Sequence, residues 1–338
     1  MDRKRDKMKD ALYFEIYGNK EKKLVKCNLC PLYCIIADGK VGNCGIRKNV
    51  DGKLFSLTYD KFTSVSMDPI EKKPLYHFHP GSTILSMGTA GCNFHCDFCQ
   101  NWSISQDAKA PVDEITPEQA VRTAQKHASF GICYTYNEPF IWFEFVLETA
   151  RLAKKAGLKN VLVTNGSVSR EPLAEVLPFI DAANIDLKAM DEDFYAKICK
   201  GKLGPVLDTI KAMHGKAHIE LTNLVVPTLN DSPEKIAKLV DLVAEVGADI
   251  PLHFSRYHPC YKMDIPPTPE DTLKTARKIA MKKLKYVYIG NVWDPGSDAT
   301  YCPKCGKPVI ERSGFSVTRF KVKEGKCGYC GEKVDVIQ

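Results

Sequence analysis

The chain has 338 residues, of which 44% are hydrophobic, enough for a sizeable core and an argument against a disordered chain. Its formal net charge of +7 is spread over helix faces such as residues 276–285 without an aromatic-rich or arginine-rich motif, so nucleic acid is not an expected partner. The charged opening has no apolar segment behind it and no uninterrupted apolar run of about 18 residues occurs, so we expect a cytoplasmic protein without membrane contact.

Cysteine is the most informative residue type in this chain. Fourteen cysteines without a secretion signal favour metal or cluster ligation over disulfides. Eleven of them form three compact groups: Cys27, Cys30, Cys34 and Cys44; Cys92, Cys96 and Cys99; and Cys302, Cys305, Cys327 and Cys330. The isolated Cys133, Cys199 and Cys260 are interpreted as small buried apolar side chains or ordinary thiols.

The N-terminal extension, residues 1–82, contains the first cysteine group and a stretch, residues 52–69, that predicts a β-hairpin. Zinc is the first interpretation of this four-cysteine group. An auxiliary iron–sulfur cluster with a redox role is the alternative, because the spacing does not decide between them. His77 and His79, near the end of the extension, are expected at the surface or in turns.

Between residues 83 and 296, short β-branched runs alternate with amphipathic helical patterns. The runs are residues 83–89, 131–136, 161–165, 182–188, 218–226, 251–257 and 286–292. This alternation predicts an α/β core with a parallel sheet covered by helices. The periodicity leaves open whether the sheet is doubly wound or forms a closed or partial barrel.

Several helix starts in this core are marked by their capping residues. Thr116, followed by Pro117 and Gln119, predicts a capping box with proline at the first helical position. Ser232 and Thr268 are each followed by proline, which predicts the same cap-then-proline arrangement.

Polar motifs follow five of the apolar runs, at the point where each run ends. They are "GTAGC" at 88–92, "YNEP" at 136–139, "TNG" at 164–166, "DLK" at 186–188 and "RYH" at 256–258. In parallel α/β architectures, ligands bind at the carboxyl ends of the strands. We therefore expect these motifs to contribute to one site.

The stretch "GTAGCNFHCDFCQNW", residues 88–102, spaces three cysteines as C-x3-C-x2-C. A cubane [4Fe-4S] cluster normally takes four thiolates, so three leave one iron without a protein ligand. A catalytic zinc site likewise keeps one position free for water or substrate. The alternatives are a loop of buried free cysteines or a zinc site completed by His95.

The motif "CNFHCDFC", with an aromatic residue before its last cysteine, resembles the signature of radical S-adenosylmethionine (SAM) enzymes. Together with residues 68–106 and "YTYNEP", the chain resembles the AmmeMemoRadiSam system radical SAM family, which is related to pyruvate formate-lyase activating enzymes. The resemblance covers residues 20–295. It implies a partial (β/α)6 TIM-type barrel in which SAM chelates the open iron of a [4Fe-4S] cluster, and one electron cleaves SAM to a 5′-deoxyadenosyl radical and methionine.

The SAM pocket needs an acceptor for an ammonium, a cation for a carboxylate and polar groups for the ribose. Glu138 can accept from the ammonium, at a position that resembles the family's second-strand motif; it could equally favour a helix N-terminus. Tyr136 and Asn137 replace two glycines of the usual pattern, which leaves a backbone contact at Asn137 open. Thr164 and Asn165 resemble the family's ribose element or form an ordinary turn.

Asp186 and Lys188 alternate along one strand, so both side chains point to the same side, expected to be the barrel interior. Lys188 could pair with Asp186 and the SAM carboxylate, or the two could form a structural ion pair. His258 resembles the adenosine-proximal histidine of activating enzymes. Arg256 is a candidate for the substrate or the SAM carboxylate, whereas His253 is expected to be structural.

The C-terminal segment, residues 297–338, contains "CPKCG" at 302–306 and "CGYCG" at 327–331. Two C-x2-C pairs followed by glycines predict the tight knuckles of a structural zinc ribbon. A rubredoxin-like iron centre is the alternative. Such a short module is expected to fold only with its metal.

We therefore expect an oxygen-sensitive radical SAM oxidoreductase that abstracts hydrogen from an unidentified substrate and receives electrons from a donor such as a ferredoxin or flavodoxin. Kinship to activating enzymes suggests a glycyl-radical protein as substrate. A small molecule or another protein residue within a partner system is the alternative. A zinc-rich interaction or nucleic-acid-binding protein is the competing class.

Overall fold

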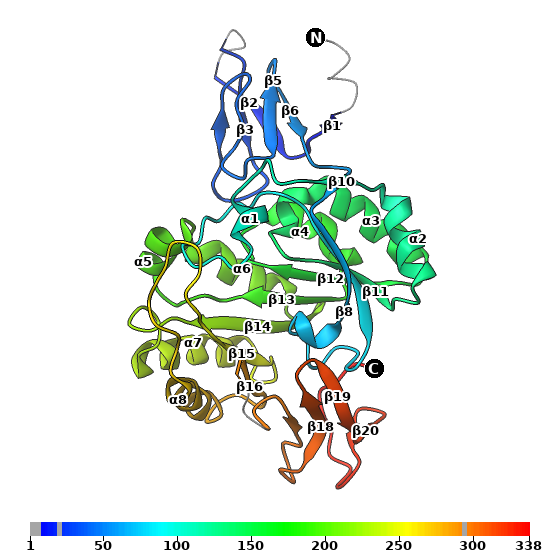
Figure 1. Cartoon of the computed structure of the whole chain (residues 1–338), viewed down its shortest axis with the longest axis vertical. Coiled ribbons are helices and arrows are strands. Elements are labelled where there is room, and N and C mark those ends of the chain that lie inside the picture. The colour runs from blue at the N-terminus through cyan, green and yellow to red at the C-terminus, as the bar shows by residue number, and fades with distance from the viewer. Residues whose placement is uncertain (1–7, 19–21, 293–295) are drawn as a thin grey trace.

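The computed structural model describes residues 8–18, 22–292 and 296–338; the charged residues 1–7 lie outside this range. A central α/β part carries the N-terminal cysteine-rich part at one end and the C-terminal part at the other (Figure 1). Within the described residues, no helix is long and apolar enough to cross a membrane.

The central part is built on one eight-stranded sheet. Its strands, in spatial order, are β16 (Val287–Gly290), β15 (Leu252–Arg256), β14 (His218–Val225), β13 (Ala182–Asp186), β12 (Lys159–Thr164), β11 (Gly131–Tyr134), β9 (Thr83–Gly88) and β8 (Ser64–Pro69). All neighbours from β9 to β16 pair in parallel, whereas β8 pairs antiparallel with β9 at the edge. Each of the seven predicted runs forms a strand.

The strand order decides between the two architectures that periodicity left open. The parallel strands follow one another in chain order without reversal, unlike a doubly wound sheet. Because crossover connections are right-handed, an unreversed order puts successive helices on the same face of the sheet. The sheet is curved and open, with β8 and β16 at its edges (Figure 1). This is the expected partial barrel.

Helices cover the outer face of the sheet (Figure 1). They are α2 (Pro117–Lys126), α3 (Phe143–Lys155), α4 (Arg170–Val176), α6 (Leu203–Met213), α7 (Pro233–Val246) and α8 (Glu270–Ala280), whereas the short α1 (Trp102–Ser105) and α5 (Glu192–Phe194) lie in the connections after β9 and β13. Shorter helical turns are η3 (Ile70–Lys72), η4 (Pro139–Trp142), η5 (Leu177–Phe179) and the π-helical η6 (Tyr195–Cys199).

Two of the three predicted helix caps are confirmed. Thr116 and Gln119 form the capping box of α2, and the Ser232 hydroxyl accepts from the amide of Lys235 in α7. The prediction for Thr268 is wrong. Its hydroxyl instead accepts from the amide of Tyr257 and donates to a carbonyl of β14, so it fixes a buried loop rather than capping α8.

The N-terminal part consists of small sheets. One contains β1 (Lys9–Asp10), β6 (Lys53–Ser56) and β5 (Arg47–Val50); another contains β2 (Phe14–Tyr17), β3 (Leu24–Cys27) and β4 (Ile35–Ile36); and β7 (Lys61–Phe62) pairs with β10 (Asp113–Glu114). The hairpin expected within residues 52–69 is wrong in its partners. Its first strand, β6, pairs antiparallel with the preceding strand β5, and its last strand is β8, which pairs with β9 in the central sheet.

The C-terminal part contains β17 (Thr300–Tyr301), β18 (Pro308–Ser313) and β19 (Ser316–Phe320), with β20 (Val322–Lys323) pairing with β21 (Lys326–Cys327). It is joined to the barrel by a buried polar contact. The two ring nitrogens of His77 lie 2.7 Å from the Asp335 carbonyl oxygen and 2.6 Å from the Tyr288 hydroxyl. The surface position expected for His77 is therefore wrong, because it satisfies polar groups of both parts at once; His79 does begin a turn.

Candidate active site

The three-cysteine loop begins directly after β9, at the carboxyl end of the sheet. Cys96 is buried, and Cys92 and Cys99 are partly exposed. Two local features require the glycine at position 91, in "AGC". Gly91 has a φ of 88°, and a Cβ there would lie 2.4 Å from the carbonyl oxygen of Cys44. Only glycine permits this conformation and this approach.

A distant segment fixes the middle of the loop. The amides of His95 and Asp97 donate to the carbonyls of Cys199 and Ile198, at 2.9 and 3.0 Å. Both acceptors belong to η6, the π-helical turn, a rare form that is frequent at functional sites. The loop is therefore held by backbone contacts as well as by its connection to β9.

His95 does not complete a metal site with the three cysteines. Its Nδ1 is hydrogen-bonded to the side-chain oxygen of Gln106, and its Nε2 lies 3.1 Å from the carbonyl oxygen of Asn43. The zinc alternative for this loop therefore loses its proposed fourth ligand.

The second and third parallel strands bring three of the expected residues together. The buried Glu138 carboxylate accepts from the Thr164 hydroxyl at 2.8 Å and from the Asn165 amide at 2.7 Å. It also accepts from the Phe140 amide at 3.0 Å, so Glu138 caps the start of η4 as well, which was the alternative role. Burial raises the pKa of Glu138 to about 7.

This group reaches the cysteine loop through Asn165. Its side-chain nitrogen lies 2.9 Å from Asn93 Oδ1 and 3.8 Å from the sulfur of Cys92. Asn137 contacts the same loop by its side chain, which donates to the Gly91 carbonyl at 2.8 Å. Residues from two strand ends therefore surround the first cysteine.

The fourth strand end supplies the expected ion pair. Lys188 Nζ lies 2.9 Å from Asp186 Oδ2, and the lysine side chain is 12% exposed. Burial alone lowers the pKa of Lys188, but the nearby Asp186 carboxylate and the negative charge of a Cys96 thiolate raise it overall. The ammonium also lies over the Phe98 ring, at 5.5 Å from its centroid. Lys188 is thus a buried cation beside the cysteine loop.

The sixth strand end contributes less to this site. Arg256 donates to the Thr268 carbonyl at 2.8 Å and pairs with Glu270 at 3.7 Å, so it is directed to the start of α8. His258 follows it at an exposed position. His253 is structural as expected, because it is buried and its Nε2 lies 2.6 Å from a carboxylate oxygen of Glu220.

Cys199 is the site residue that the sequence interpretation missed. The Cys199 carbonyl accepts from the amide of His95, and the Cys199 side chain, together with the nearby Lys188 cation, lowers the pKa of Cys96 despite its burial. The hydroxyl oxygen of Ser105 lies 3.1 Å from the sulfur of Cys99. Neither contact has a sequence signal, since Cys199 lies in no cysteine motif.

Among the described residues, the only metal-sized group of three or more histidine, cysteine or acidic ligands is Cys302, Cys305, Cys327 and Cys330. Their sulfurs all lie within 4.8 Å of one another. Cross-pair distances are 3.6 Å between Cys302 and Cys330 and 3.8 Å between Cys305 and Cys327. A tetrahedral zinc with bonds of about 2.3 Å places its sulfurs about 3.8 Å apart, so the group fits such an ion.

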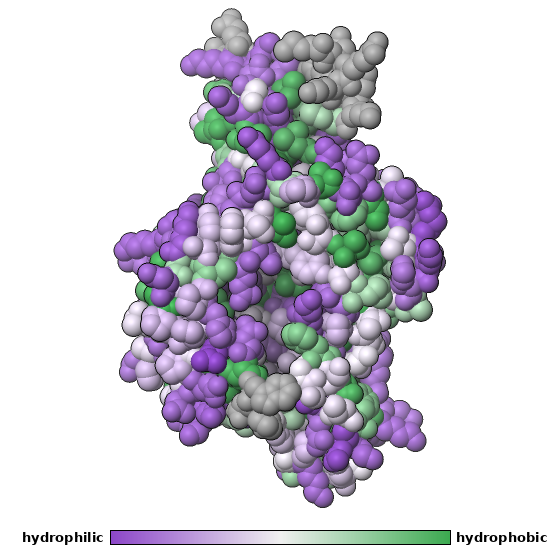
Figure 2. Space-filling model, in the orientation of Figure 1, coloured by the Kyte–Doolittle hydropathy of each residue, from purple (hydrophilic) through white to green (hydrophobic). Residues whose placement is uncertain are grey.

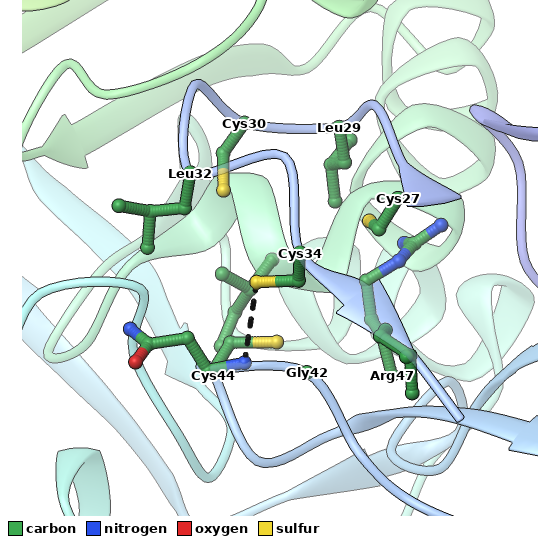
Figure 3. A pocket seen from close by; sticks show the side chains of 11 residues that line it. Cys27, Leu29, Cys30, Leu32, Cys34, Gly42, Cys44 and Arg47 are labelled. Carbon is green, nitrogen blue, oxygen red and sulfur yellow. Dashed lines mark hydrogen bonds between the residues drawn. The ribbon is translucent and has the colours of Figure 1, made fainter. Parts of the chain in front are cut away.

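The remaining four cysteines, Cys27, Cys30, Cys34 and Cys44, line one cavity in the N-terminal part (Figure 3). The space-filling view also shows a hollow near the middle of the molecule, bordered by polar and apolar residues (Figure 2).

Comparisons with known proteins agree with this geometry. A model of the Radical SAM superfamily matches residues 87–243. An uncharacterized protein of Methanocaldococcus jannaschii is 44% identical over 338 residues, covering 98% of this chain and all of that protein. The pyruvate formate-lyase-activating enzyme of Clostridium pasteurianum is 26% identical over 179 residues, covering 50% of this chain and 72% of the enzyme.

One solved structure extends the comparison to the fold. Streptococcus suis SuiB bound to S-adenosylmethionine aligns with a TM-score of 0.50 at 14% identity, covering 69% of this chain and 54% of SuiB. At this identity the likeness concerns the fold alone. Taken with the loop geometry and the relatives, these matches mean that the chain belongs to the radical SAM superfamily and is related to pyruvate formate-lyase activating enzymes.

Proposed function

We propose that Cys92, Cys96 and Cys99 hold a [4Fe-4S] cluster with one open iron, and that the neighbouring strand ends bind SAM. When bound, these cofactors supply a 5′-deoxyadenosyl radical that abstracts hydrogen from substrate. The observation that carries the proposal is the chain of contacts from Glu138 through Asn165 to the sulfur of Cys92.

Glu138 and Lys188 are the proposed partners of the two charged groups of the amino-acid end of SAM. Glu138 is a buried carboxylate whose pKa is raised by burial to about 7, so an approaching ammonium would stabilise its charged form. Lys188, paired with Asp186, offers a cation for the SAM carboxylate. Both charges are largely shielded from water, which strengthens such contacts.

The polar neighbours have supporting roles in this proposal. Thr164 and Asn165 would contact the ribose, and Asn137 would hold the cysteine loop through its bond to Gly91. His258, exposed at the end of β15, is proposed to face adenosine.

Residues 297–338 are proposed to form a structural zinc module. The sulfur spacing of Cys302, Cys305, Cys327 and Cys330 supports this assignment. Gly306 and Gly331 follow the two pairs with φ of 67° and 77°, and their amides donate to the carbonyls of Cys302 and Cys327. These are the tight knuckles that glycine permits.

The substrate proposed is a glycyl-radical protein, with a low-potential ferredoxin or flavodoxin as electron donor. Kinship to activating enzymes supports it. The alternative is a small molecule or another protein residue.

The central experiment is anaerobic incubation with dithionite and SAM, followed by measurement of 5′-deoxyadenosine and methionine. The iron-loaded protein should form both, and a Cys96→Ala variant should form neither. A Cys133→Ala variant is the matched control, because Cys133 is equally buried but lies within β11. Equal activity of all three proteins would refute the proposal.

The substrate is tested by adding a glycyl-radical protein to the same mixture. A glycyl radical signal in electron paramagnetic resonance, together with more 5′-deoxyadenosine, is the expected result. If turnover rises only with a small molecule or with another protein, the alternative substrate class holds.

A further inference from the structure

The four cysteines of the N-terminal part come together around one cavity. Cys27 ends β3, Cys30 and Cys34 lie in the loop to β4, and Cys44 precedes β5. All four line one small cavity, and their side chains surround it (Figure 3).

The C-terminal cysteine group provides an internal standard for this spacing. The sulfurs of the C-terminal group lie within 4.8 Å of one another, as one tetrahedral ion requires. Among the described residues no three N-terminal sulfurs are so close, and neither are the sulfurs of Cys92, Cys96 and Cys99. A cubane binds its thiolates at separate iron corners and so spreads them more widely than one ion does. The N-terminal sulfurs are therefore spread more widely than those of the C-terminal group, as a cubane allows.

The cavity also offers hydrogen-bond donors to sulfur. The amides of Leu29 and Leu32 donate to Cys27 and Cys30, and the Asn43 amide lies 3.4 Å from the Cys34 sulfur. Such donors stabilise thiolates around a buried cofactor and tune its reduction potential.

Arg47 adds a buried cation with an unused donor. Its side chain is 1% exposed, and its NH1 nitrogen lies 2.9 Å from a carboxylate oxygen of Glu144. Its Nε, by contrast, is buried without a hydrogen-bond partner among the described residues. Figure 3 shows the guanidinium beside Cys27. Buried N–H groups rarely stay unpaired, so an additional acceptor such as a cluster sulfide would account for it.

The cavity lies directly against the loop of Cys92. The carbonyl oxygen of Cys44 would be 2.4 Å from a Cβ at Gly91, the residue before Cys92. Asn43 links the two loops, because its side chain donates to the Asn93 carbonyl at 3.0 Å and its own carbonyl lies 3.1 Å from His95 Nε2. A cofactor in this cavity would be separated from the Cys92 loop by little more than one layer of backbone.

We propose that Cys27, Cys30, Cys34 and Cys44 hold a second cubane iron–sulfur cluster, a one-electron centre beside the loop of Cys92, Cys96 and Cys99. It takes one electron from an external low-potential flavin or iron–sulfur protein and passes it to the cluster proposed at Cys92, Cys96 and Cys99, a transfer that rests on the proposed function, with no bond made or broken. This site does not depend on the proposed reaction with SAM.

The test removes the other iron site first. The full chain with Cys92→Ala, Cys96→Ala and Cys99→Ala is produced in cells supplied with both iron and zinc and is isolated without air. We expect about four irons and four sulfides per chain, thiolate-to-iron absorption in the visible range and a paramagnetic signal after dithionite reduction. Adding Cys30→Ala and Cys44→Ala should abolish all three, whereas adding Cys133→Ala should not.

A second measurement guards against misfolding of the multiple variant. In the otherwise unaltered chain, the double change Cys30→Ala with Cys44→Ala, which leaves only two thiolates, should lower iron and sulfide to about half while SAM-dependent changes in the remaining cluster signal persist. A colourless triple variant with zinc in place of iron would overturn the proposal. So would unaltered iron and sulfide in the otherwise unaltered chain with Cys30→Ala and Cys44→Ala.

Discussion

Replacement of Lys188 by methionine tests the proposed SAM carboxylate contact most directly. Methionine preserves an unbranched side chain of similar length but removes the ammonium that lies 2.9 Å from Asp186 Oδ2. It keeps the contact with the Phe98 ring, because a thioether packs well against an aromatic edge. The change therefore isolates the charge.

The expected effect on SAM binding is large. A hydrogen bond to a charged group contributes about 1.5–3 kcal/mol, which corresponds to a roughly 10- to 150-fold increase in Kd. The expected effect on stability is smaller. The Asp186 side chain is 34% exposed, so water can solvate it after the lysine charge is removed, and the loss should be about 1 kcal/mol.

The assay is SAM titration of the anaerobic iron-loaded protein by calorimetry, with urea unfolding in parallel. Lys159→Met is the matched control, since Lys159 also pairs with an aspartate, Asp181, at 3.2 Å, but at the opposite end of its strand. That variant should bind SAM as the parent does. If Lys188→Met leaves the Kd unchanged, Lys188 is a structural ion-pair partner and the assigned contact is wrong.

Three further predictions concern the loop, the barrel contact and the C-terminal module. Gly91→Ala should lower the iron content of the protein, because the added Cβ would lie 2.4 Å from a backbone carbonyl oxygen. Gly157→Ala is the control, since Gly157 also has a positive φ, 76°, but open space around it, and this variant should keep its iron. Equal iron contents in the two variants would contradict this prediction. Burial lowers the pKa of His77 from 6.5 to about 4. As the pH decreases, the unfolded chain therefore binds a proton at His77 before the folded chain does, and the free energy of unfolding decreases. Urea unfolding should show that the free energy of unfolding drops by about 1 kcal/mol between pH 7 and 5.5. His77→Gln should reduce this drop, whereas His127→Gln, at an exposed position, should not. An unchanged pH dependence in His77→Gln would be inconsistent with the assignment. Cys302→Ser should lower zinc per chain and the unfolding temperature, since so small a module depends on its metal, and unaltered zinc would rule this out.

Local sequence patterns determined much of this protein. Apolar runs predicted all seven parallel strands, because a strand buried on both faces must be apolar along its length. The cysteine spacings and the motifs at the strand ends predicted which loops meet, since parallel strands end at one edge. Glu138 and Asn165 are indeed within hydrogen-bond distance.

Only the tertiary structure decided the features that depend on contacts between distant segments. Cys199 is 103 residues from Cys96, yet its carbonyl accepts from the amide of His95, the residue before Cys96, and no local pattern encodes this contact. Thr268 and His77 each have a residue type typical of caps or surfaces, but buried partners from other strands set their roles. The spacing of cysteines along the chain indicates how many thiolate ligands one loop can supply. Only the folded structure sets the distances between their sulfurs, and these distances decide whether a cavity suits one ion or a cluster.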